Sequence, residues 1–425
     1  MSLRLAASMG AVQTIVSMAL SFVSIKITSV FLGPAGLGTM GQLGIFIAMS
    51  QAVLAAGVGT GVVRRTAELD LDRPKRDLVV STVLRGLLAV GAGSALLVAV
   101  GSGWLARELL HDPSLRFAFL IYAVVFVFGL VSTVVLSCAT GAKDFRSVAF
   151  INIGTGVSSF ALIAALCPYL GLAGGLIATA LLPLVTAAIG WLFARAHAWW
   201  PKRPLSHGFS VLEARGVVAF VPIALTTAIG LPLLQLLIRD SVAAHSGMAS
   251  VGLLQGVMRI SDMYLGVASG VFSMYFFPRF SEIRDHRELL FEVKRGLLLI
   301  VPAVAATSLA IYLLRDLIIQ VIFTKDFLPM RELFGWQMAG NTLKMVGWLL
   351  GYVLLAKANP FAMAALEVTS LGVWWLLSVI FVSRSGALGA TEAFAVTYGL
   401  YAIATLIGVV FVLRSMKAQS RPVAP

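Results

Sequence analysis

Long apolar segments follow one another along almost the whole chain, with only short polar stretches between them. Each segment has about 20 to 28 residues, which as a helix is enough to cross a hydrocarbon layer of about 30 Å. The apolar positions run continuously instead of alternating, and this favours helices over a β-barrel. The pattern predicts twelve membrane-spanning helices, near residues 7–32, 36–63, 78–103, 116–138, 147–168, 172–195, 215–240, 250–278, 293–314, 331–356, 361–383 and 392–414.

The composition supports this prediction. Of the 425 residues, 59% are hydrophobic and only 12% are charged, and the mean hydropathy is +0.95. A soluble core could not bury so much apolar surface, so the chain is an integral membrane protein of the all-α class. The net charge of +13 comes from basic residues spread through the loops, so it gives no reason to expect nucleic acid as a partner.

The basic residues also predict the orientation of the helices. With the N-terminus in the cytoplasm, 22 lysines and arginines fall on the cytoplasmic side or at helix ends there, and 7 fall on the opposite side. Cytoplasmic loops carry the excess of basic residues in membrane proteins. We therefore expect both termini in the cytoplasm.

The sequence offers little material for enzymatic chemistry. No loop exceeds about 20 residues, the phosphate-binding pattern GxxxxGK[ST] is absent, and so is HExxH. The five histidines all lie in predicted loops and far apart. Cys138 and Cys167 are expected roughly a membrane thickness apart, too far for a disulfide and too few for a metal site. We expect a transporter with no cofactor and no ATPase of its own.

The two halves of the chain resemble each other. The run Arg-Gly-Leu-Leu at 85–88 recurs at 295–298, and Gly171 and Gly174 correspond to Gly386 and Gly389. This predicts two six-helix bundles, 1–200 and 215–425, joined by a cytoplasmic linker at 201–214. Two such bundles, related by an axis along the membrane normal, would leave a central cavity that opens to alternate sides as they rock.

Charged side chains lie inside the predicted spans or at the end of one: Lys26, Arg239, Asp240, Arg259, Asp262, Lys344 and Glu367. Each charge at the centre of a bilayer costs about 2.5–3.5 kcal/mol on insertion scales. Such side chains are therefore expected to face water or one another. Arg259 and Asp262 share a helix face and could pair, as could Lys344 and Glu367 on neighbouring helices, so purely structural ion pairs remain an alternative.

The balance of these charges favours an anionic cargo. We expect Lys26, Arg239, Arg259 and Lys344 to be cavity cations, with Asp262 and Glu367 as acids that trim the charge or carry a coupling proton. The sum is +2. Arginine and lysine both bind phosphate oxygens, so the simplest anion is a diphosphate.

Several stretches resemble a known family. They are FLGPAGLG at 31–38, LLQGVMRISDMYL at 253–265, LLRD at 313–316, MRELFGWQ at 330–337, LLAKA at 354–358, Glu367 and GALGA at 386–390. With them the chain resembles the Wzx flippases of the multidrug/oligosaccharidyl-lipid/polysaccharide exporter superfamily, over nearly its whole length. The likeness is greatest to the branch that moves lipid III, the precursor of enterobacterial common antigen, and to O-antigen translocases.

The resemblance implies a flippase of the bacterial inner membrane. Its cargo would be an undecaprenyl-diphosphate-linked oligosaccharide, carried from the cytoplasmic to the periplasmic leaflet among membrane lipids. A polymerase and a chain-length regulator of the same pathway are implied as partners. One alternative is a cation-coupled drug exporter of the same superfamily, which a negatively charged cavity would favour. A second alternative, a membrane polymerase or ligase, would need a large periplasmic loop, and the sequence has none.

Overall fold

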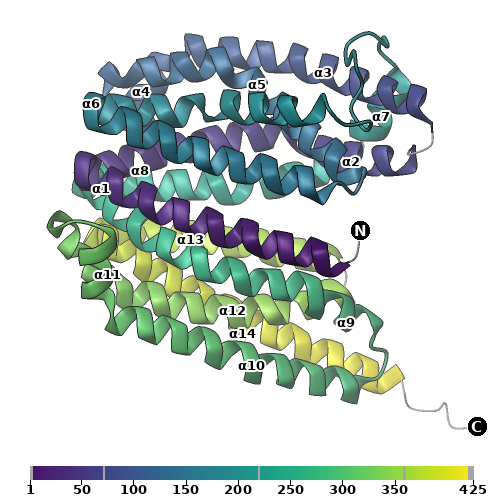
Figure 1. Cartoon of the computed structure of the whole chain (residues 1–425). Helices are drawn as coiled ribbons and strands as arrows, with labels where there is room; N and C mark the ends of the chain where they lie inside the picture. Colours follow the sequence, from purple (N-terminus) through teal and green to yellow (C-terminus); the bar gives the residue numbers. More distant parts are fainter. Residues whose placement is uncertain (1–2, 70–71, 219–220, 358–359, 420–425) are drawn as a thin grey trace, which may run out of the picture. The chain divides into compact units, whose positions relative to one another are not determined.

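The computed structural model describes residues 3–69, 72–218, 221–357 and 360–419, and these residues are almost entirely helical. This confirms the predicted all-α class. The elements, labelled as in Figure 1, are α1 (Leu3–Ala55), α2 (Val58–Glu68), α3 (Arg73–Val100), α4 (Ser102–Leu110), η1 (Pro113–Leu115), α5 (Arg116–Gly141), α6 (Phe145–Ala194), α7 (Val211–Val218), α8 (Val221–Val271), η2 (Phe272–Phe276), α9 (Phe277–Glu282), α10 (His286–Leu313), α11 (Arg315–Ile322), η3 (Lys325–Glu332), α12 (Leu333–Lys357), α13 (Pro360–Ser385) and α14 (Ala387–Gln419).

The three longest helices are each interrupted by one glycine with a positive φ angle. These glycines are Gly33 in α1, Gly171 in α6 and Gly247 in α8, and Gly386 separates α13 from α14 in the same way. A side chain is strained at such angles, so glycine is the residue expected there. In α6 and α8 the chain folds back at the glycine. A Cβ on Gly174 would lie 2.2 Å from the Leu166 carbonyl oxygen, and Arg239 contacts Met258.

The chain forms two compact units, Met1–Leu236 and Leu237–Pro425, which we describe separately. In the first unit α5 is the central helix and packs against α2, α3, α4 and α6 (Figure 1). Phe119, Tyr122 and Phe126 lie on one face of α5 and are fully buried. Tyr122 also holds the neighbouring α1, because its hydroxyl lies 2.6 Å from the Ser50 hydroxyl.

In the second unit α12 takes the central place and packs against α9, α10 and α14 (Figure 1). Its buried residues Met345, Leu349 and Val353 meet an aromatic cluster that begins in η2, a π-helical turn, with Phe272 and Phe276. Because α12 packs against helices on several sides, side chains on its different faces contact different helices. This arrangement positions the charged residues described below.

Seven helices in the described residues are long and apolar enough to cross a membrane, judged by length and composition. The structure therefore supports the prediction that the chain crosses a membrane several times. Both cysteines are buried free thiols, as expected from their predicted separation.

Candidate functional site

Four of the predicted site residues come together in the second unit. Arg239 and Arg259 lie on the two segments of α8 that flank Gly247, Asp262 lies one turn beyond Arg259, and Lys344 lies on α12. Asp262 is close enough to interact electrostatically with Lys344, Arg239 and Arg259. We call these four residues the charged cluster. It holds three cations against one carboxylate.

The cluster is not a set of tight ion pairs. Within the described residues, no nitrogen of the three cations lies within 4.0 Å of an Asp262 oxygen. The possible pair of Arg259 and Asp262 is therefore a longer-range interaction, although the two share a helix face. Both side chains are exposed. The guanidinium and the carboxylate are therefore both accessible to a further group.

Lys344 is held by aromatic rings. Its ammonium lies 4.6 Å from the centre of the Trp348 ring, 5.3 Å from that of Tyr398 and 5.8 Å from that of Phe394. Ring faces attract a cation without neutralising it, with about 0.5–2 kcal/mol per contact. The rings therefore fix the ammonium in place while leaving its positive charge available to an anion.

Close packing of α14 on α12 produces this cage. Gly340, Lys344 and Gly347 share one face of α12. A Cβ on Gly340 would lie 2.4 Å from the Phe394 ring, and one on Gly347 would lie 2.5 Å from the Tyr401 ring. Small residues on either side of Lys344 thus let α14 approach until its aromatic side chains reach the ammonium.

Arg239 is the buried member of the charged cluster, with 4% of its surface exposed. Its Nη2 group lies 3.8 Å from the Met258 sulfur, whereas Nε and Nη1 have no hydrogen-bond partner among the described residues. A buried guanidinium with unpaired donors is costly, because its hydration is lost without replacement. These donors are suited to receive the oxygens of an anion.

A buried polar network lies beside the charged cluster. Asn341 is fully buried, and its amide nitrogen lies 2.8 Å from both the Ser261 and Tyr264 hydroxyl oxygens. Tyr264 in turn lies 2.9 Å from the Ser308 hydroxyl. The network links α8, α10 and α12 next to Asp262 and one turn from Lys344. It therefore fixes the spacing between the carboxylate and the ammonium.

Glu367 and Lys26 are not members of the charged cluster. Glu367, on α13, accepts a 2.6 Å hydrogen bond from the Tyr401 hydroxyl. No ion pair within 4.0 Å joins it to Lys344 in the part of the chain that the structure describes, so the pairing considered for these two residues is not formed. Lys26 is half-buried in α1 and belongs to the first unit.

Sequence reasoning did not identify the uncharged members of this site. Gln337 and Asn341 are polar residues four positions apart in an otherwise apolar helix, and this spacing was a usable sign of a buried network. Nothing in the sequence indicated that aromatic rings of a different helix surround Lys344, because periodicity identifies a helix face but not the neighbour that covers it.

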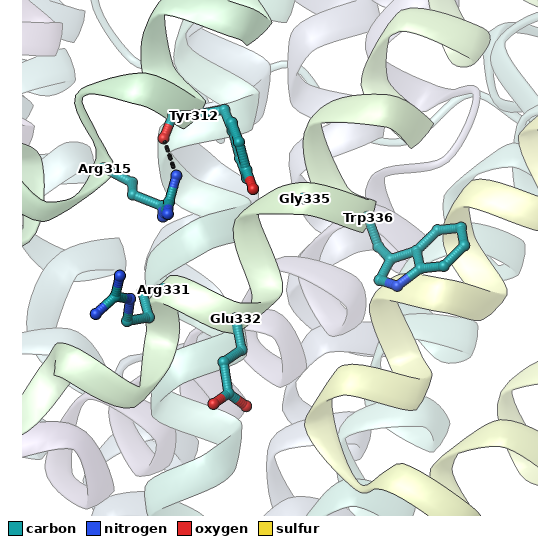
Figure 2. A pocket seen from close by; sticks show the side chains of 6 residues that line it. All are labelled: Tyr312, Arg315, Arg331, Glu332, Gly335 and Trp336. Carbon is teal, nitrogen blue, oxygen red and sulfur yellow. Dashed lines mark hydrogen bonds between the residues drawn. The ribbon is translucent and has the colours of Figure 1, made fainter.

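A second place where charged and aromatic groups meet lies at one end of the second unit. Figure 2 shows this pocket of about 350 Å³, lined by Tyr312, Arg315, Arg331, Glu332, Gly335 and Trp336. Five of these residues belong to the stretches 313–316 and 330–337, which carry part of the family resemblance, and Tyr312 directly precedes the first stretch. The Arg315 guanidinium lies 4.3 Å from the centre of the Tyr312 ring and donates a 2.7 Å hydrogen bond to the Tyr312 carbonyl oxygen. Aromatic faces beside charged donors and an acceptor can bind a polar ring such as a sugar.

Comparison with known proteins places the chain in a family. A family model described as "Polysaccharide biosynthesis protein" matches residues 28–332. Two curated relatives, each named Lipid III flippase, come from Escherichia coli (strain K12) and Shigella flexneri. Each is 28% identical to this chain over 406 residues, which are 94% of this chain and 96% of the relative.

Solved structures share the fold. An inward-facing multidrug resistance MATE family transporter of the MOP superfamily matches with a TM-score of 0.78 and 17% identity, over 96% of this chain and 100% of its own. The Lipid II flippase MurJ, in an inward closed conformation, matches with a TM-score of 0.75 and 12% identity, over 97% of this chain and 89% of its own. At these identities the likeness shows the fold alone.

Proposed function

Because the chain belongs to the family of polysaccharide biosynthesis proteins, we propose that it is a flippase for an undecaprenyl-diphosphate-linked oligosaccharide, either lipid III or an O-antigen unit. The observation that carries the proposal is the similarity to lipid III flippases over 94% of the chain. The protein is a transporter and not an enzyme. It moves its cargo from the cytoplasmic to the periplasmic leaflet of the bacterial inner membrane, by alternating access.

The charged cluster is proposed to bind the diphosphate. Three cations against one carboxylate leave an excess of positive charge, and the unpaired donors of Arg239 and the caged ammonium of Lys344 suit phosphate oxygens. Such a site lowers the cost of bringing the anionic head group into the membrane region. Lys26 is proposed as a further cavity cation, and Asp262 and Glu367 as the groups that carry a coupling proton.

The predicted twelve spans in two six-helix halves form part of the proposal. The reversal glycines Gly33 and Gly247 are 214 positions apart, and Gly171 and Gly386 are 215 apart. Asp72 caps α3 and Asp285 caps α10, again at nearly the same spacing. This recurrence supports a duplication with halves 1–200 and 215–425 and the linker 201–214. The excess of basic residues supports two cytoplasmic termini.

The pocket in Figure 2 is proposed to contact the sugars of the cargo. Its rings and charged groups suit hydroxylated molecules, and in the proposed orientation it lies on the periplasmic side, where the oligosaccharide is released. The polymerase and the chain-length regulator of the same pathway are the partners we expect there. The lipid tail needs no such site, because it can remain in the bilayer while the head group crosses.

Reconstitution tests the proposal. Proteoliposomes that contain the purified chain should move a fluorescently labelled undecaprenyl-diphosphate oligosaccharide between leaflets, while a labelled phosphatidylcholine stays in its own leaflet. Protein-free liposomes provide the background rate. Transfer at the background rate would contradict the proposal, and cation-driven accumulation of a lipophilic drug would favour the exporter whose fold this chain shares.

A further inference from the structure

A second basic site lies in the first unit and shares no residue with the charged cluster. It is a pocket of about 650 Å³ between the start of α3 and the segment that follows α6. Its lining includes five basic residues of the Lys and Arg types and one acid: Arg73, Arg76, Arg195, Lys202, Arg203 and Asp77. Such an excess of cations in one concave place attracts anions more strongly than the same charges dispersed along loops.

The segment after α6 is fastened to α3 and forms one wall of the pocket. Arg76 donates a 2.9 Å hydrogen bond to the Ala198 carbonyl oxygen, Ser81 donates one of 2.9 Å to that of Gly208, and Arg85 donates one of 2.6 Å to that of Leu205. The backbone of this segment, between α6 and α7, can be followed beside α3 in Figure 1. These hydrogen bonds hold the segment after α6 against α3, so this wall of the pocket has a defined position in the fold.

Two lining residues carry buried donors without a hydrogen-bond partner in the described part of the chain. Arg76 is 5% exposed, and its Nε makes no hydrogen bond but lies 3.9 Å from the Asp77 Oδ1, a long ion pair. Trp200 is 4% exposed, and its indole nitrogen makes no hydrogen bond. Buried donors are normally satisfied, so unsatisfied ones in a cationic pocket indicate that an acceptor belongs nearby. The four other cations, Arg73, Arg195, Lys202 and Arg203, are exposed and can reach an incoming group.

In the proposed topology the pocket lies at the depth of lipid head groups. The apolar helix α6 ends at Ala194 and α3 begins at Arg73, and the pocket is built from the first turns of α3 and the residues just after α6. Trp200 lines the pocket and follows Trp199 in the chain, and tryptophans are typical of the boundary between hydrocarbon and water. Basic pockets at this depth on the side rich in lysine and arginine suit anionic head groups.

We propose that this pocket is a binding site for a phosphate group, supplied by the head group of an anionic phospholipid or by free phosphate. The site contains none of the residues proposed to bind the cargo, and its occupant is not the flipped cargo. Bound phosphate would neutralise the repulsion among the five cations and hold the segment after α6 against α3. The proposal does not depend on which oligosaccharide the protein carries.

A lipid-binding measurement on the full chain tests the proposal. The purified protein in detergent is titrated with phosphatidylglycerol or phosphatidylcholine, and bound lipid is counted by native mass spectrometry. The pocket variant is Arg195→Gln/Lys202→Gln/Arg203→Gln. The matched control, Arg284→Gln/Arg287→Gln/Lys294→Gln, removes the same charge from exposed residues of the other unit. We expect the pocket variant to lose about tenfold or more in affinity for phosphatidylglycerol and the control to retain it.

The variants also separate the two sources of phosphate. Calorimetric binding of inorganic phosphate that is lost in the pocket variant alone would assign free phosphate, whereas lipid binding without it would assign the head group. The variant Arg195→Lys/Arg203→Lys keeps the charge and should still bind, which distinguishes lost binding from lost folding. Equal loss in the pocket variant and the control, or equal binding of phosphatidylglycerol and phosphatidylcholine, would overturn the proposal.

Discussion

The Tyr401 hydroxyl donates a 2.6 Å hydrogen bond to the Glu367 carboxylate and so joins α14 to α13. Tyr401 also packs against Gly347 of α12, the helix that carries Lys344. A change in the charge of Glu367 can therefore shift Tyr401, which lies on α14 with two of the rings that surround Lys344. Through Tyr401, Glu367 can therefore influence the proposed anion site, although Glu367 and Lys344 do not form an ion pair.

The first prediction concerns coupling to protons. If Asp262 or Glu367 carries the coupling proton, then Asp262→Asn or Glu367→Gln should still bind cargo but should lose the acceleration that an imposed pH gradient produces. The amides keep the size of the side chain and cannot titrate. Transport in proteoliposomes with and without a gradient measures this, and Tyr401→Phe tests whether the link to Glu367 is needed. An unchanged response in both amide variants would exclude these carboxylates.

The second prediction concerns the cations. Arg259→Ala and Lys344→Ala should each reduce transport about tenfold to a hundredfold, because a charge-assisted contact contributes about 1.5–3 kcal/mol. The amount of protein in the membrane should stay normal. Arg287→Ala, an exposed arginine elsewhere in the same unit, serves as the control. Normal transport in both variants would remove the main support for an anionic cargo, and loss of the protein itself would favour a structural role.

The third prediction concerns orientation. Single cysteines at Arg73, Arg203 and Arg287 should react with an impermeant thiol reagent only from the cytoplasm, and cysteines at positions 112, 245 and 325 only from the periplasm. All six positions are exposed, and the native Cys138 and Cys167 are buried and should give little background. Whole cells are compared with inside-out vesicles. Reaction of all six from one side would refute the twelve-helix topology.

The fourth prediction concerns the pocket in Figure 2. Trp336→Ala or Tyr312→Ala should raise the KM for the lipid-linked oligosaccharide about threefold to tenfold, because an aromatic contact contributes about 0.5–1.5 kcal/mol. Trp375 is similarly exposed on α13 and away from the pocket, so Trp375→Ala is the control. Equal kinetics in all three variants would separate the pocket from the transport cycle.

The fifth prediction concerns the loop before α6. Partial burial acts to raise the pKa of Asp144, but hydrogen bonds donated by Ser147 and Trp199 outweigh it, so its pKa lies below the usual value. A carboxylate with a lowered pKa in the folded state stabilises that state above the unfolded pKa near 4, and this contribution is lost as the pH falls further.

Asp144→Asn should therefore lower the free energy of unfolding by about 1–2 kcal/mol at pH 7, and the difference from the unmodified chain should shrink below about pH 4. Thermal unfolding in detergent at both pH values measures this effect. Asp326→Asn, at an exposed carboxylate without a hydrogen bond among the described residues, should change little at either pH. A constant difference across the pH range would contradict the assignment to Asp144.

The sequence predicts the positions of the helices better than the contacts between them. The predicted ends at 32 and 168 fall close to Gly33 and Gly171, because a glycine between two long apolar runs is a strong local sign of a break. The cage around Lys344 could not be predicted, because it depends on how closely α14 approaches α12. For the same reason Glu367 could be recognised as unusual in an apolar helix but not as the partner of Tyr401.

The single-glycine reversals also restrict how the protein can change shape. Where α6 and α8 fold back at Gly171 and Gly247, the turn has no spare residues that could lengthen or rotate. We therefore expect the two segments of each hairpin to stay together during a transport cycle, and bending to occur away from these turns. Within the second unit the π-helical turn at Phe272–Phe276 is such a place, since its hydrogen bonding already departs from that of an α-helix. We therefore expect bending within the second unit at this π-helical turn and not at Gly247.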